Sequence, residues 1–221
     1  LATCIPDVRG LRIAWSPDLG YAAVDPEVRR ITERAALTFS DLGAIVEQPT
    51  LNLDGALILE TFRTVWETDL VANYGHLLES HRDDLDPFLR QQLENASTWP
   101  AIKLSFALRE LERHRGIVRN LMANYDLLLT PSLAIPAFTL GEFPKTIDGR
   151  LLADPLWDFT PFSYPFNMTG NPAASIPCGF TSDGLPVGLH VVGRLGAEAT
   201  VIRASAAFEE AHPWQHIRPP I

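Results

Sequence analysis

The most constraining feature of this sequence is the segment 186–192, Pro-Val-Gly-Leu-His-Val-Val, which is largely apolar at both alternating sets of positions. Successive side chains of a β-strand point to opposite faces, so a strand with one face in water shows a polar residue at every second position. A strand that is apolar on both faces needs cover from two layers. We therefore predict an interior strand, in a sheet that carries helices on both sides.

The first fifty residues predict a strand-helix-strand unit over 11–48. Residues 11–15 are expected to form a short strand, and 44–47 are expected to form the returning strand. Between them, Asp25 is a typical N-cap, and Pro26 suits the first helical position, where its missing N–H costs nothing. Apolar residues then recur at helical spacing until a glycine ends the pattern.

Residues 54–124 predict a helical layer, with helix starts at Asp54 and Asp86 and the longest helix at 101–124. The last helix carries four arginines interleaved with two glutamates, which in chain order are Arg109, Glu110, Glu112, Arg113, Arg115 and Arg119. Arginine and glutamate at this spacing favour a solvated face with ion pairs. The net charge of −9 also argues against a nucleic-acid-binding surface.

The sheet and loop region is predicted over 125–212, with strands at 125–131, 173–178 and 187–192 and a closing helix at 199–211. Residues 131–172 are rich in proline, glycine and aromatic residues and show little periodicity. Disordered segments are poor in aromatic residues, so a long irregular stretch of this composition indicates a functional loop. The alternation of strands and helices predicts an α/β fold with a mixed central sheet covered by helices.

Several classes of protein are not favoured by the sequence. No apolar run approaches the roughly 20 residues of a membrane span, no signal peptide is visible, and the two cysteines imply no disulfide framework. We expect a cytoplasmic protein. His212 and His216 have the spacing of a metal pair, but Pro213 interrupts the helix that would align them. No G-x-S-x-G, G-x-G-x-x-G or Walker motif is present, and we expect no metal or cofactor.

Four motifs follow one another in the second half of the chain. They are Tyr-Asp-Leu-Leu-Leu-Thr-Pro-Ser at 125–132, Phe-Thr-Pro-Phe at 159–162, Asn-Met-Thr-Gly-Asn-Pro-Ala-Ala-Ser-Ile-Pro-Cys-Gly at 167–179 and Asp-Gly-Leu-Pro-Val-Gly-Leu-His-Val-Val-Gly at 183–193. Their order and spacing resemble the C-terminal region of the amidase signature family. The resemblance covers essentially all 221 residues, most strongly from 125 to 212. It implies the C-terminal half of a single amidase domain.

The resemblance also implies a reaction, the hydrolysis of an amide through an acyl-enzyme intermediate. Enzymes of this family use a serine nucleophile, a second serine and a lysine base, presented by a glycine-rich segment. This sequence contains no Gly-Gly and no Ser-Ser dipeptide, and its only lysines are Lys103 and Lys145. We therefore assign no catalytic residue. We expect the catalytic N-terminal part to lie outside this chain, which opens on Leu1 without an initiator methionine, and we expect the chain alone to be inactive.

What the resemblance implies for this half is the wall of a substrate pocket. The candidate residues are Thr130, Pro131, Ser132, Trp157, Phe159, Phe162, Asn167 and Gly170. The alternative is that Asn167, Gly170 and Pro172 simply form a turn into a strand and that the aromatic residues fill the core. Asp158 is expected to cap a loop. His190 stands where the family usually has glutamine, and is expected to be a hydrogen-bonded interior residue.

Three functions remain open from the sequence. The first is a stand-alone amidase for a small or medium, partly apolar amide, which the passage 157–167 favours. The second is the homologous component of the tRNA-dependent amidotransferase. The third is a scaffold that kept the fold without catalysis. The expected partners are a small-molecule amide, the N-terminal half and, as a further candidate, a second copy of the chain.

Overall fold

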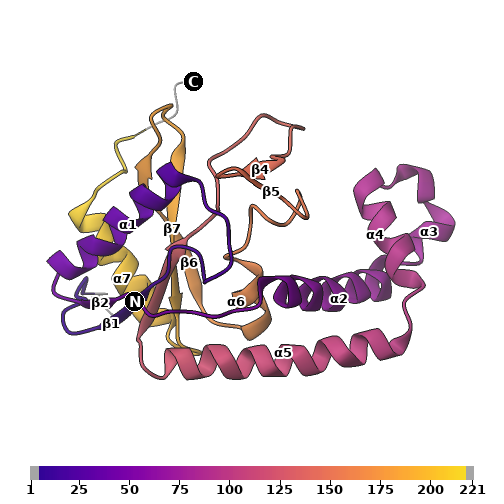
Figure 1. The fold of residues 1–221 in the computed structure, drawn as a ribbon, viewed down its shortest axis with the longest axis horizontal. Coiled ribbons are helices and arrows are strands. Elements are labelled where there is room, and N and C mark those ends of the chain that lie inside the picture. Colours follow the sequence, from indigo (N-terminus) through magenta and orange to yellow (C-terminus); the bar gives the residue numbers. More distant parts are fainter. Residues whose placement is uncertain (1–4, 218–221) are drawn as a thin grey trace. The chain divides into compact units, whose positions relative to one another are not determined.

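A computed structural model describes residues 5–217 of the chain (Figure 1). The chain divides into two compact units. The sheet unit is formed by the segment that ends at Gly55 together with the segment that begins at Val118, and the helical unit is Ala56–Ile117.

The sheet unit is built on a five-stranded mixed sheet with the strand order β2-β1-β3-β7-β6. The pairs β1–β2 and β1–β3 are parallel, whereas β3–β7 and β6–β7 are antiparallel. The strands are β1 (Arg12–Trp15), β2 (Ile45–Glu47), β3 (Leu127–Pro131), β6 (Ala173–Phe180) and β7 (Pro186–Gly193). The prediction that the last three strands are neighbours is confirmed, and β7 is the interior strand that its two apolar faces require.

The two faces of the sheet bury different residues. One face packs Leu129, Leu189 and Val191 against helices α1 (Pro26–Asp41) and α7 (Glu198–Ala211). Both helices flank the sheet in Figure 1. On the opposite face, the buried residues of the sheet and of the elements that cover it include Ala14, Leu128, Val192, Val118, Met122, Tyr125, Phe162 and Phe166. The mixed sheet therefore has a packed layer on each side, as the sequence predicts.

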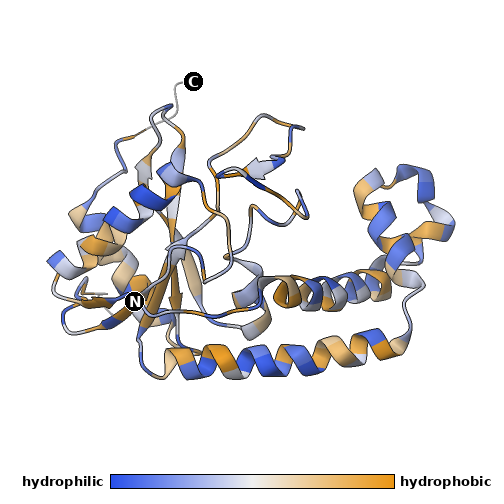
Figure 2. Cartoon of the chain, viewed as in Figure 1, coloured by the Kyte–Doolittle hydropathy of each residue, from blue (hydrophilic) through white to orange (hydrophobic). Residues whose placement is uncertain are grey.

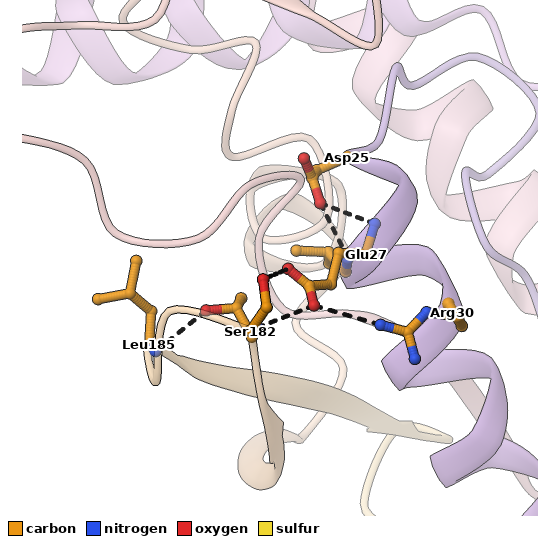
Figure 3. Close-up of polar contacts among 7 residues, drawn as sticks. Asp25, Glu27, Arg30, Ser182 and Leu185 are labelled. Atoms are coloured by element: carbon orange, nitrogen blue, oxygen red, sulfur yellow. Dashed lines mark hydrogen bonds and ion pairs between the residues drawn. The ribbon is translucent and has the colours of Figure 1, made fainter.

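Helix α1 begins where the sequence predicts. Asp25 is the N-cap, and its Oδ1 accepts hydrogen bonds from the backbone N–H groups of Glu27 at 2.9 Å and Val28 at 3.0 Å. This satisfies two of the N–H groups that have no partner within the helix. The same end of α1 is joined to the turn between β6 and β7, because the Glu27 carboxylate binds Ser182 (Figure 3).

The region 131–172 is mostly irregular, as predicted, but it contains a small hairpin and one helix. The hairpin pairs β4 (Thr146–Ile147) with β5 (Arg150–Leu151), and the helix is α6 (Tyr164–Thr169). The predicted turn from Asn167 to Gly170 is therefore wrong in part, because its first three residues form the last turn of α6. Pro165 suits the first turn of a helix, and Gly170 ends the helix with a left-handed φ of 72°.

The helical unit confirms the predicted run of helices. Asp86 caps one of them, since its Oδ1 accepts from the N–H of Phe88 at 2.9 Å. The elements that carry the chain through this unit are α2 (Gly55–Tyr74), α3 (Leu77–Ser80), a 3₁₀ turn (Arg82–Asp84), α4 (Pro87–Ser97) and α5 (Ala101–Met122). Within residues 5–217 none of the helices combines the length and the apolar composition that crossing a membrane demands.

Helix α5 has the ion-paired surface that the sequence predicts. Arg113 pairs with Glu110, and Arg115 pairs with Glu112, each three positions apart. Hydrophilic and apolar residues alternate along the helix in Figure 2. Two of the arginines that could suggest a nucleic-acid surface are thus engaged with carboxylates of their own helix.

Candidate functional site

The segment Thr130-Pro131-Ser132 lies at the carboxyl end of β3, the region of a parallel strand where α/β proteins usually place ligands. Thr130 is fully buried, and its hydroxyl donates to the carbonyl oxygen of Pro131 at 2.9 Å. The Ser132 side chain is only partly buried, while its backbone N–H donates to the carbonyl oxygen of Gly188 at 2.9 Å. Of these three predicted site residues, Thr130 and Pro131 are buried and Ser132 is partly exposed.

Ser132 has a partner that the sequence reasoning missed. Its hydroxyl oxygen lies 2.6 Å from that of Ser175, an exposed residue of β6. The two hydroxyls meet over Gly188 of β7, where an added Cβ would lie 2.7 Å from both oxygens. Only glycine leaves room for the pair, and we call these three residues the serine notch.

His190 lies on the same face of the sheet as the notch. In the register of the sheet it is opposite Ser175 of β6 on one side and Thr130 of β3 on the other. Its Nδ1 is 3.4 Å from the Thr130 hydroxyl, and its ring meets the ring of Phe166 edge-on at 5.7 Å. Burial lowers the pKa of His190 to about 4, so the ring is neutral at pH 7. The expected hydrogen bond is present, and the expected interior position is confirmed only in part, because the His190 side chain is partly exposed.

The predicted aromatic residues separate into core and surface. Phe162 is fully buried, whereas Phe159 is partly buried and Trp157 half-buried. The Phe159 ring contacts Phe138 in a T-shaped arrangement at 5.2 Å and Phe143 at 6.4 Å. Phe138 and Phe143 are 38% and 45% exposed. Neither was singled out from the sequence, although an aromatic residue in an irregular, proline-rich loop is a usable signal.

The aromatic loop is held in place by bonds to distant residues. The Tyr21 hydroxyl donates to the carbonyl oxygen of Pro161 at 2.7 Å, and burial raises the pKa of Tyr21 well above its ordinary value. The backbone N–H of Ala134 donates to the carbonyl oxygen of Phe159 at 3.0 Å. Asp158 accepts from the backbone N–H of Asp154 at 2.9 Å, which confirms its expected role as a loop cap.

Asn167 and Gly170 lie on the exposed surface at the end of α6. The residue that links this end to the sheet is Asn171, whose Nδ2 donates to the carbonyl oxygen of Gly193 at 2.7 Å. Thr169 donates to Asn171 Oδ1 at 2.6 Å and so orients the amide. This segment therefore has a structural role. Its Gly-Asn-Pro sequence is typical of a turn.

The family model named Amidase matches residues 4–202, which is most of the sequence. This chain belongs to the amidase family. An acylamidase of Rhodococcus erythropolis is 35% identical over 219 residues, which cover 96% of this chain and 45% of that protein. A glutamyl-tRNA(Gln) amidotransferase subunit of Moorella thermoacetica is 32% identical, over 97% of this chain and 47% of the relative.

Solved structures agree with this family assignment. A bacterial aryl acylamidase of the amidase signature enzymes has a TM-score of 0.84 at 29% identity, covering 96% of this chain and 45% of that one. A 6-aminohexanoate cyclic dimer hydrolase in complex with its substrate has a TM-score of 0.81 at 26% identity, covering 99% and 49%. The amidase family member described here thus spans about half the length of the curated relatives it matches, and the predicted family and α/β fold are confirmed.

Proposed function

We propose that this chain is the C-terminal part of an amide hydrolase and supplies sheet scaffold and one wall of the substrate pocket. The observation that carries the proposal is the match to an acylamidase along 96% of the chain, in a sequence without Gly-Gly or Ser-Ser. The nucleophile, the second serine and the lysine base of the proposed reaction then come from residues outside these 221.

The proposed pocket wall is supported by the residues at the carboxyl end of β3. Ser132 supplies a partly exposed hydroxyl, and Phe159 with its neighbouring rings supplies apolar surface. Small-molecule pockets combine mostly apolar walls with a few fixed polar groups. This composition favours a partly apolar amide as the substrate.

The exposed side of β6 supports the proposal that further protein covers this sheet. β6 is an edge strand of eight residues, and Ala173, Ser175 and Pro177 on one of its faces are exposed. A long edge strand has unpaired backbone N–H and C=O groups, which tend to pair with another strand unless other protein covers them. We propose that the half of the enzyme that carries the nucleophile provides this cover.

The experiment compares the 221-residue chain with the longer protein that contains it. Both are assayed against a panel of aliphatic and aromatic amides. We expect hydrolysis by the longer protein alone, since loss of the nucleophile and base typically costs several orders of magnitude in rate. Turnover by the isolated chain that disappears when one of its serines is changed to alanine would place the nucleophile within this chain and contradict the proposal.

The tRNA-dependent amidotransferase is the second candidate, because the homologous component from Moorella thermoacetica is 32% identical over 97% of the chain. That function predicts glutamine as the ammonia donor and a dependence on misacylated tRNA. Release of ammonia from glutamine that rises on adding such a tRNA, with no hydrolysis of simple amides, would favour it. A longer protein without the serines and the lysine would instead favour a scaffold.

A further inference from the structure

We propose that Tyr21 is a positioning residue, which holds the loop 157–162 through Pro161 and thereby sets the position of Phe159 in the substrate pocket. The inference rests on the proposed function, since it needs an amide substrate that contacts Phe159. It deepens that function, because it makes the choice between aromatic and aliphatic amides depend on a residue that lies 140 positions from Pro161. Tyr21 was not among the residues that the sequence singled out.

The bond between Tyr21 and the loop satisfies a buried backbone group. The Tyr21 hydroxyl donates to the carbonyl oxygen of Pro161 at 2.7 Å. Pro161 is buried and lies in a turn, outside any helix or strand that would supply a donor. Buried backbone carbonyl groups need a partner, and where the backbone supplies none a side chain takes its place. Loss of the Tyr21 hydroxyl would therefore favour a shift of the loop.

Phe159 lies between two such bonds. Its own carbonyl oxygen accepts from the backbone N–H of Ala134 at 3.0 Å. Two residues later, the carbonyl oxygen of Pro161 accepts from Tyr21. Ala134 is held in turn by Asp25, whose backbone N–H donates to the Ala134 carbonyl oxygen at 2.8 Å. The position of the Phe159 backbone thus depends on Tyr21 and on Asp25 through two separate sets of bonds.

Tyr21 is itself fixed, as a positioning residue has to be. Its backbone N–H donates to the carbonyl oxygen of Asp18 at 3.0 Å, and the Asp18 carboxylate pairs with Arg29 of α1 at 3.0 Å. Its ring lies against the backbone of Gly55, where an added Cβ would be 2.2 Å from Cδ2 of the ring. Glycine at position 55 leaves room for the ring, so Gly55→Ala would displace Tyr21 without removing its hydroxyl.

A second tyrosine supports the same hydroxyl. Tyr164 of α6 is buried, and its hydroxyl is hydrogen-bonded to that of Tyr21. A tyrosine hydroxyl has one hydrogen, and that of Tyr21 goes to Pro161, so Tyr164 is the donor in this pair. Burial raises the pKa of Tyr164 to about 12 and the pKa of Tyr21 well above its ordinary value. Both hydroxyls therefore keep their hydrogens at neutral pH, and the bond to Pro161 stays in place.

The consequence for the substrate follows from the packing of the Phe159 ring. This ring meets Phe138 in a T-shaped arrangement at 5.2 Å and lies 6.4 Å from Phe143. Aromatic rings prefer edge-to-face or offset-stacked arrangements, so a substrate ring should respond more to a shift of Phe159 than an alkyl chain does. We therefore expect loss of the Tyr21 hydroxyl to lower the preference for aromatic over aliphatic amides.

The test uses the longer protein that contains this chain and two amides, phenylacetamide and hexanamide. Tyr21→Phe removes the hydroxyl and keeps the ring. We expect it to lower the ratio of kcat/KM for phenylacetamide to kcat/KM for hexanamide by about 3- to 10-fold, since one apolar contact in a pocket is worth about 10-fold or more in discrimination. Gly55→Ala should change the ratio in the same direction. In a Phe159→Ala background, Tyr21→Phe should have no further effect, because it acts through that ring.

Tyr125→Phe is the matched control. It removes a tyrosine hydroxyl that bonds to the Glu47 carboxylate, and it should leave the ratio unchanged. Thermal unfolding of each variant fixes an assay temperature at which all of them are folded. The inference would be overturned by an unchanged ratio in Tyr21→Phe or in Phe159→Ala, by an equal change in Tyr125→Phe, or by a full effect of Tyr21→Phe in the absence of the Phe159 ring. In each of these cases the proposed function would stand. A wild-type protein that hydrolyses no amide would overturn both.

Discussion

The carboxylate of Glu27 accepts two hydrogen bonds from Ser182, although 155 positions separate these residues. The backbone N–H of Ser182 binds Oε1 at 2.9 Å, and its hydroxyl binds Oε2 at 3.3 Å (Figure 3). Glu27 lies in the first turn of α1, where a negative charge is also favourable for the helix dipole. The Glu27 side chain thus links the start of α1 to the turn between β6 and β7 through hydrogen bonds.

We expect Glu27→Ala to lower the free energy of unfolding by about 1–2 kcal/mol, because it removes charge-assisted hydrogen bonds that are partly exposed to solvent. Urea unfolding at pH 7 measures the change. Glu33→Ala is the control, since Glu33 is an exposed residue of the same helix. Equal changes in the two variants would mean that the bond to Ser182 contributes nothing to stability.

His190 predicts a pH dependence of stability. Its pKa is about 4 in the folded protein, and about 6.5 in an unfolded chain. As the pH falls below 6.5, His190 is protonated in the unfolded chain but stays neutral in the folded protein until the pH approaches 4. The contribution of neutral His190 to the free energy of unfolding is therefore complete above pH 6.5 and declines towards pH 4. The loss should reach up to about 3 kcal/mol.

The measurement is the free energy of unfolding between pH 4 and pH 7, for the wild type and for His190→Gln. Other groups titrate in both proteins, so the difference between the two curves isolates His190. We expect the wild type to lose more stability than the variant on acidification. Parallel curves would show that His190 has the same proton affinity in the folded and unfolded states.

Phe159 and Phe162 should respond differently to truncation, although they are three positions apart. Phe162 is fully buried, so Phe162→Ala should destabilise the protein by about 3–5 kcal/mol through the cavity it leaves. Phe159→Ala should cost less stability and should alter the relative kcat/KM for aromatic and aliphatic amides in the longer protein. Equal losses of stability would place both rings in the core.

Cys178 should react slowly with alkylating reagents. Burial raises the pKa of its thiol to about 12, so almost none of it is thiolate at pH 8. Labelling with iodoacetamide, followed by mass spectrometry of the peptides, measures the rate. A Cys4→Ser variant removes the other thiol, which lies outside the described residues. Labelling of folded Cys178 as fast as in urea would contradict the shifted pKa.

Local sequence patterns determined a large part of this fold. Asp25 followed by Pro26 marks the start of α1, because capping depends on neighbours in the chain. The apolar residues on both faces of 186–192 place β7 inside the sheet, because burial of both faces is a property of the strand itself. Motifs along the second half were enough to identify the family.

The tertiary structure decided which side chains meet. Ser132 and Ser175 are 43 positions apart, and only the register of β3, β6 and β7 brings their hydroxyls together over Gly188. Likewise, nothing in the sequence separates Phe159 from Phe162, because two aromatic residues in one loop have the same composition whichever of them enters the core. Periodicity reports how a segment is buried on average, whereas contacts depend on the register and packing between segments that are distant in the chain.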